Sequence, residues 1–229
     1  MTNSLKIENF QDSADCKTLT YQSRESFLKC SYDFAAGKAY GIVSDFGCGS
    51  WGLVTCLGGR GTDKYSGVMI VNEKEVSRRE LNEISCFVAE NVFPGINSPQ
   101  ELLTPEKCIE KALAVSGQAY SAAEIKDIFR LSDNRFKRPL ENVSGEIWQI
   151  STAINFALGK DVFCYPWLNE INISRFEAAC EIGTIDFLKK VGKIILVPSS
   201  QEKKLKKYWI LYISHVIRIR YQTIQNLHS

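Results

Sequence analysis

The stretch of sequence from which the fold can be read is residues 41–53, GIVSDFGCGSWGL. Residues 39–43 form a short apolar run that is typical of a buried strand, and residues 53–57 are expected to be helical. Between them, Gly47 and Gly49 permit a tight backbone path. A strand, a glycine-rich turn and a helix in this order direct backbone N–H groups towards one point at the start of the helix, which favours an anion there.

A working phosphate loop needs more than this backbone path. It also needs a lysine that meets the β- and γ-phosphates, followed by a hydroxyl residue that holds magnesium. Ser50 and Trp51 stand at these two positions, and Ser44 stands where the first glycine of the pattern is expected. The pattern therefore leaves two interpretations open, a tight turn without ligand and a nucleotide loop that has lost its lysine.

The rest of the chain alternates between strand and helix patterns. Residues 5–10 and 26–34 alternate polar and apolar side chains, which predicts an antiparallel β layer at the N-terminus. Residues 94–142 carry Ser, Thr and Pro at helix starts and no strand pattern, which predicts a helical insert. Short apolar strands then alternate with helices, as in a parallel sheet with right-handed crossovers. The other predicted elements are strands at 67–71, 84–88, 162–165 and 193–197 and helices at 105–115, 122–131, 146–158 and 174–190.

Composition limits the classes of function. The 229 residues include 28 Lys and Arg against 26 Asp and Glu, a net charge of +2, which does not favour a nucleic acid as partner. With 45% hydrophobic residues the chain has ample material for the core of one globular domain, 1–229. The two histidines, His215 and His228, argue against histidine chemistry and a multi-histidine metal site.

The eight cysteines form no C-x-x-C pair and no short disulfide spacing, which predicts structural thiols in a reducing compartment. The N-terminus lacks the basic start and apolar core of a secretory signal. No apolar stretch reaches the roughly 18 residues that a membrane-spanning helix needs. We therefore expect a cytoplasmic protein without direct membrane insertion, or one held peripherally at the inner face of the membrane through a permease.

The order of these segments, over about residues 5–213, resembles the nucleotide-binding subunit of ABC transporters. Residues 41–53 are similar to its phosphate loop, and 94–142 lie where its helical subdomain is expected. Residues 143–146, VSGE, resemble its signature segment, and 192–200 resemble its last catalytic strand and switch loop. The resemblance implies a P-loop NTPase-like ABC ATPase fold of the α/β class. That fold has an N-terminal antiparallel β layer, a parallel-sheet core and a helical subdomain insert.

The resemblance also implies a set of nucleotide contacts. An aromatic residue stacks on adenine, the loop holds the phosphates, and the signature segment meets the γ-phosphate of ATP bound to the opposite subunit. The matching residues are Tyr21, Gly47, Cys48, Gly49, Ser50, Trp51, Gly52, Ser144 and Gly145. Tyr21 is equally well interpreted as a strand residue that packs on the β layer, and Ser144 as a helix N-cap. ATP is the cofactor that the resemblance implies.

The catalytic positions of the family are substituted. Its magnesium-binding Asp and its Glu base correspond to residues 164–169, CYPWLN, which contain no carboxylate. The switch histidine corresponds to Ser199 or Ser200, and the loop glutamine corresponds to Glu90, whose charge repels phosphate. We therefore predict no catalytic residue and no metal site, and the missing lysine argues against tight ATP binding.

Three functions stay open at this point. The first is a degenerate or regulatory partner of an active ABC ATPase and a permease, or a homodimer of such subunits. The second is a weak ATPase with an unconventional site in which Asp45, Glu90 or Glu146 replaces the lost carboxylates. The third is a nucleotide-independent scaffold that uses its aromatic residues for protein interaction.

Overall fold

The computed structural model describes residues 1–17, 22–61, 65–88, 103–143, 146–169, 176–177, 183–201 and 215–218. Several predictions fall on other residues and lie outside the described ranges. They concern Tyr21, Glu90, Ser144 and Gly145, the start of the helical insert at 94–102 and most of the first half of the helix at 174–190. Residues 202–213, the end of the stretch that carries the family resemblance, also lie outside.

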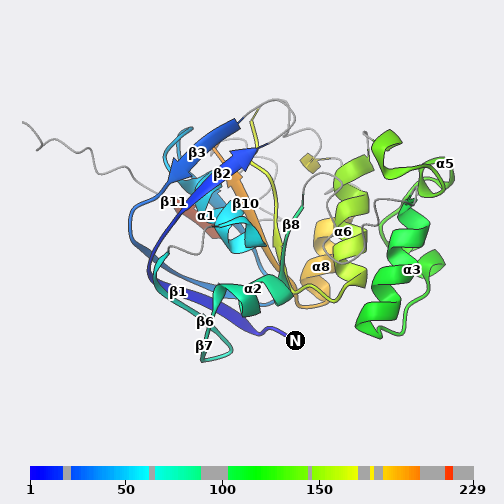
Figure 1. Cartoon of the computed structure of the whole chain (residues 1–229), viewed down its shortest axis with the longest axis horizontal. Helices are drawn as coiled ribbons and strands as arrows, with labels where there is room; N and C mark the ends of the chain where they lie inside the picture. The colour runs from blue at the N-terminus through cyan, green and yellow to red at the C-terminus, as the bar shows by residue number, and fades with distance from the viewer. Residues whose placement is uncertain are drawn as a thin grey trace, which may run out of the picture.

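One layer of the protein is antiparallel, as the N-terminal pattern predicts (Figure 1). Its order is β4-β1-β6-β7, and a separate hairpin of β2 and β3 stands beside it. The predicted strand at 26–34 is in fact divided: Ser26 ends β3, and β4 begins at Cys30. The division follows from Phe27, which is buried and stacks on Phe10. The strands are β1 (Ser4–Gln11), β2 (Ser13–Lys17), β3 (Gln22–Ser26), β4 (Cys30–Ala35), β6 (Ser66–Val71) and β7 (Lys74–Val76).

Within the described ranges the second sheet has five strands in the order β11-β5-β10-β9-β8, and the pairings between them are parallel. Alternate residues of β10 enter two different cores. Ile194 and Leu196 pack with α1 and the antiparallel layer, whereas Ile195 and Val197 pack with α6 and α8. The strands are β5 (Ala39–Val43), β8 (Ser85–Phe87), β9 (Val162–Cys164), β10 (Ile194–Ser199) and β11 (His215–Arg218).

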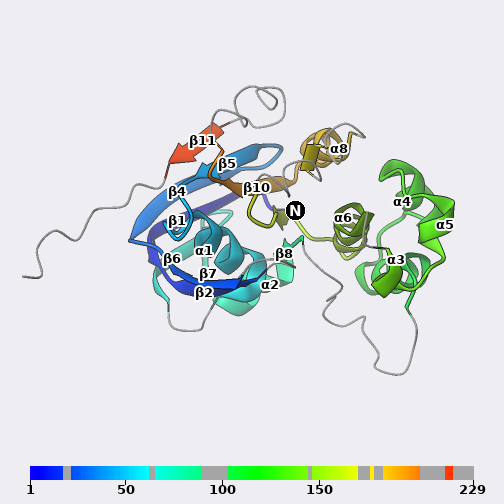
Figure 2. The same ribbon diagram turned by 90° about the horizontal axis from the view of Figure 1, so that it is seen from above.

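Helices cover both faces of this sheet. α1 is enclosed between the antiparallel layer and the parallel sheet, and α6 separates the sheet from α3, α4 and α5 (Figures 1 and 2). No helix within the described ranges is long and apolar enough to cross a membrane. The helices are α1 (Ser50–Thr55), a π-helical turn η1 (Cys56–Arg60), α2 (Arg78–Ile84), α3 (Pro105–Ser116), α4 (Ala122–Ile128), α5 (Asp133–Phe136), a 3₁₀ turn η2 (Leu140–Asn142), α6 (Ile147–Ala157) and α8 (Thr184–Lys190).

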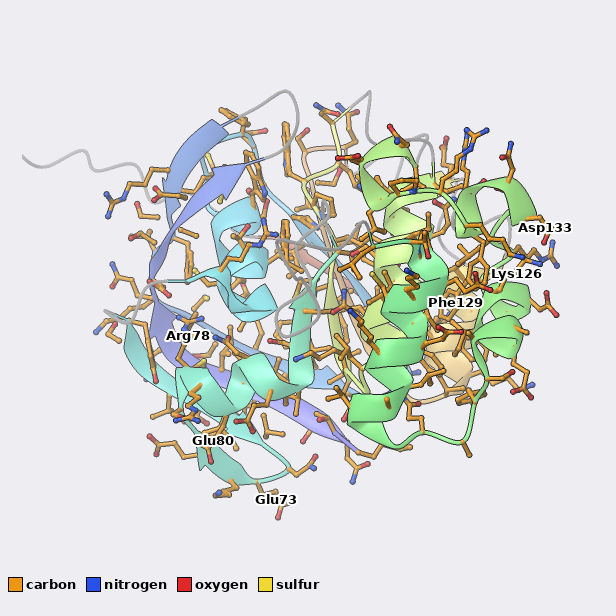
Figure 3. All side chains as sticks on the ribbon, turned by 45° about the vertical axis from the view of Figure 1, so that its right-hand side comes forward. Glu73, Arg78, Glu80, Lys126, Phe129 and Asp133 are labelled. Atoms are coloured by element: carbon orange, nitrogen blue, oxygen red, sulfur yellow. The ribbon has the colours of Figure 1, made fainter. Side chains whose placement is uncertain are left out.

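Helix α2 is absent from the sequence-based prediction, which places the start of a strand at Ile84. The structure extends α2 to Ile84 and starts β8 one residue later. A capping box begins α2, because the Ser77 side chain accepts from the Glu80 N–H and the Glu80 carboxylate accepts from the Ser77 N–H. Arg78 of α2 is buried in an ion pair with Asp12, so the helix is anchored to the antiparallel layer (Figure 3).

Candidate functional site

The glycine loop, residues 44–52, runs from the end of β5 into the first turn of α1. Its glycines Gly47 and Gly49 have φ angles of 77° and 98°, in the left-handed region that favours glycine. Around Gly47 there is open space. At Gly49 a Cβ atom would lie 2.5 Å from the Cβ of Phe27. Gly49 is therefore required both by its backbone angle and by the close approach of the residue that follows β3.

Ser50, at the position where a phosphate loop has its lysine, is buried and engaged within the loop. The hydroxyls of Ser50 and Ser44 are 2.8 Å apart and share a hydrogen bond. The Ser50 N–H donates to the Ser44 hydroxyl over 3.2 Å. The side chain at this position therefore closes the loop on itself.

Glu25 of β3 is the residue of this site that sequence reasoning misses. Its two carboxylate oxygens accept hydrogen bonds from the loop, one from the Gly47 N–H at 3.2 Å and one from the Gly52 N–H at 3.0 Å. The side chain is buried, with Glu25 only 2% exposed. Burial raises the pKa of this carboxyl, and the N–H groups of Gly52, Gly47 and Gly49 offset part of the rise.

No pattern in the sequence distinguishes Glu25 from other acidic residues in polar strands. Its hydrogen-bond partners lie 22 and 27 residues away along the chain. The contact is formed because the β2–β3 hairpin packs against α1 (Figure 1).

Three aromatic side chains, Phe46, Trp51 and Trp167, form a cluster beside the loop. The Trp51 and Trp167 rings are stacked at 6.1 Å, and Phe46 lies 5.2 Å from Trp167. Trp51 is fully buried, and its indole N–H has no acceptor among the described residues. Phe46 is about half exposed, at 49%, so the cluster reaches the surface at one edge.

Residues 164–169 begin with the last residue of β9 and leave the sheet at the carboxyl ends of its strands, where β5 also ends. Trp167 of this segment joins the aromatic cluster. The Tyr165 hydroxyl lies 3.2 Å from the Thr152 hydroxyl inside the helical core. Leu168 forms a bridge to Ser199, whose hydroxyl donates to the Leu168 carbonyl at 3.2 Å. Ser199, one of the two residues that the sequence offers for the switch position, is thus buried and bonded to the backbone.

The described carboxylates that could serve an unconventional ATPase site are exposed, bonded to other residues or distant from the glycine loop. Asp45 of the loop is exposed. Glu146 accepts from Arg135 at 3.1 Å and from the Ser132 N–H at 3.2 Å. Asp161 lies before β9, at the opposite edge of the sheet from the loop, because parallel strands all end at the same edge. Across the described ranges no three His, Cys, Asp or Glu residues are grouped so as to hold a metal ion.

A cavity of about 480 Å³ lies between η1, β8 and helices α3 and α6. The Lys160 ammonium donates to the carbonyls of Asn82 and Glu83 at 2.7 and 2.9 Å, and burial lowers its pKa. None of the residues predicted as a site lines this cavity, which is therefore separate from the glycine loop. The lining residues are Gly58, Gly59, Arg60, Asn82, Glu83, Ser85, Cys86, Phe87, Val115, Asn155, Leu158 and Lys160.

Comparison with solved structures identifies the class of fold. The chain is similar to a putative ABC transporter ATP-binding protein from Pyrococcus furiosus, with a TM-score of 0.61 and 15% identity over 94% of this chain and 97% of that one. A nucleotide-free ATP-binding cassette from an ABC transporter gives a TM-score of 0.64 at 13% identity, covering 96% and 88%. A dimeric bacterial ABC transporter cassette gives 0.61 at 14% identity, covering 94% of each chain.

The architecture is therefore that of an ABC transporter ATP-binding cassette, and the predicted fold class is confirmed. No protein-family profile matches the sequence, and no curated protein matches it. At these low identities the structural likeness concerns the fold, and the chemistry of the site has to be argued from its own residues.

Proposed function

We propose that this chain is an ABC cassette-like subunit that does not hydrolyse ATP and acts as the degenerate or regulatory partner of an active ABC ATPase and a permease. The observation that carries the proposal is the aromatic cluster of Phe46, Trp51 and Trp167. It stands between the glycine loop and the end of β9, where phosphoryl transfer in this fold would need a lysine, a magnesium ion and carboxylates.

The energetic argument rests on charge. Phosphoryl transfer is catalysed chiefly by groups that stabilise negative charge in the transition state. Loss of one such group costs on the order of 10³-fold in rate, or about 4 kcal/mol. Ser50, Trp51 and Ser199 are uncharged, and residues 165–169 after β9 contain neither a carboxylate nor a cation. The positions matched to the family's catalytic groups therefore supply no charge that would stabilise the transition state.

The partner role is supported by the dimeric state of a cassette with a similar fold. One of the similar solved structures is described as dimeric. In a mixed pair, Ser144 and Gly145 of this chain would face the ATP of the active subunit, as the resemblance of residues 143–146 implies. This subunit would then contribute to ATP turnover at the partner's site, while its own site would not hydrolyse ATP.

Hydrolysis is tested with the purified chain and millimolar magnesium ATP. We expect phosphate release no faster than in a sample without protein, because the charge partners are missing. An active ABC ATPase assayed in parallel shows that the conditions are adequate. Gly47→Asp places a carboxylate in the loop where there is open space, so it separates real activity from contamination. Phosphate release that Gly47→Asp abolishes would contradict the proposal and support an unconventional ATPase.

Partnership is tested by co-expressing the chain with candidate partners, an ABC ATPase and a permease from the same organism. We expect a tagged copy of the chain to purify with at least one of them at fixed stoichiometry. Purification with neither would exclude the partner role and favour a scaffold function.

A further inference from the structure

The N–H groups of Gly47, Cys48, Ser50 and Gly52 in the glycine loop have acceptors within the protein. Gly47 and Gly52 donate to the Glu25 carboxylate, and Ser50 donates to the Ser44 hydroxyl. Cys48 donates to the Asp45 carbonyl at 3.1 Å. A phosphate bound by this loop would need the same N–H groups, because backbone amides are what a loop of this shape offers to an anion.

The chain that supplies Glu25 lies directly on the loop. A Cβ atom at Gly52 would be 3.0 Å from the Glu25 Cβ and 3.2 Å from the Glu25 carbonyl oxygen. Phe27, two residues further on, makes the close contact at Gly49 and is itself buried against Phe10. The carboxylate is therefore held in place by the packing of its own backbone and not by a long side chain reaching in from a distance.

We infer that Glu25 is the resident anion of the glycine loop and the residue that makes the loop exclude phosphate. Both carboxylate oxygens accept from loop N–H groups, so a single negative charge satisfies two of the donors that a phosphate would use, those of Gly47 and Gly52. A nucleotide phosphate would have to displace this buried carboxylate or share the space with it, and two like charges at that distance repel. The loop therefore keeps its shape without nucleotide.

This inference rests on the proposed function, because it takes the glycine loop as the place where a nucleotide phosphate would bind. The test measures amide hydrogen exchange at Gly47 and Gly52 in the full chain, with and without millimolar pyrophosphate. The variants are Glu25→Ala and the matched control Asp15→Ala, an exposed acidic residue of the same hairpin. We expect slow exchange in the unmodified chain and in Asp15→Ala, unchanged by pyrophosphate, because the acceptors are internal.

In Glu25→Ala we expect exchange at these amides to rise about tenfold and pyrophosphate to slow it again. Equal exchange in Glu25→Ala and in the unmodified chain would overturn the inference. If Glu25→Ala does not fold, the unmodified chain alone provides the test. Rapid exchange of its Gly47 and Gly52 amides that pyrophosphate slows would also overturn the inference. Each of these outcomes is independent of the hydrolysis and co-purification results, so the two proposals fail separately.

Discussion

Asp161 and Lys193 form a buried ion pair at the edge of the sheet away from the glycine loop. The carboxylate and the ammonium are 2.6 Å apart, and the Thr2 N–H donates to the second carboxylate oxygen at 2.8 Å. Burial by itself would raise the pKa of Asp161, but Lys193 and Thr2 outweigh it and lower the pKa below its ordinary value. The pair ties the N-terminus to the start of β9.

Asp161→Asn should lower the free energy of unfolding by about 3 kcal/mol at neutral pH, because it leaves the Lys193 ammonium buried without its carboxylate. Since the folded pKa is lowered, this contribution is present above the ordinary carboxyl pKa of about 3.9 and is lost as the pH falls through the folded value. Urea denaturation across pH should therefore show the deficit shrinking on acidification. Asp186→Asn, which removes an exposed carboxylate 3.9 Å from the half-buried Lys189 ammonium, should cost under about 0.5 kcal/mol.

At the scale of elements, the contact between the β2–β3 hairpin and the glycine loop predicts an asymmetry between two glycines. Gly49→Ala should destabilise the protein by about 2–4 kcal/mol, because the added Cβ forces the chain at Phe27 to move and the backbone angle is strained. Gly47→Ala has the same kind of backbone angle but open space, so it should cost about 1 kcal/mol. Equal losses in denaturant unfolding would show that the hairpin does not press on the loop.

At the scale of the whole molecule, the proposed pairing predicts an effect in trans. Ser144→Arg in this chain should reduce ATP turnover by the active partner on the order of 10²-fold or more, because it replaces a group expected to face the partner's γ-phosphate. The pair should still assemble, as judged by gel filtration. Unchanged turnover with an assembled pair would mean that residues 143–146 do not meet the partner's nucleotide.

Much of the architecture could be predicted because local patterns of residue type along the chain indicate individual strands, turns and helices. Apolar runs and the glycine turn locate β5, the glycine loop and α1, and helix caps locate α3 and α4. Helix α2 lacks such an apolar pattern, since only Leu81 and Ile84 of Arg78–Ile84 are apolar, and the sequence-based prediction omits it although Ser77 and Glu80 carry a capping-box signal. The predicted boundary of the helical subdomain and the nucleotide contacts of Tyr21, Ser144 and Gly145 stay predictions.

Residue type and spacing were enough to predict the antiparallel layer, the glycine loop and the parallel strands, and to show that residue 50 is Ser and that residues 164–169 contain no carboxylate. Such features depend on residue type and spacing along the chain, which are read directly. The contacts of Glu25 with the loop and the stacking of Trp167 on Trp51 become visible only in the folded chain. The physical reason is distance along the chain: a contact made when a hairpin or a second strand packs against the loop leaves no periodicity or spacing by which it could be recognised.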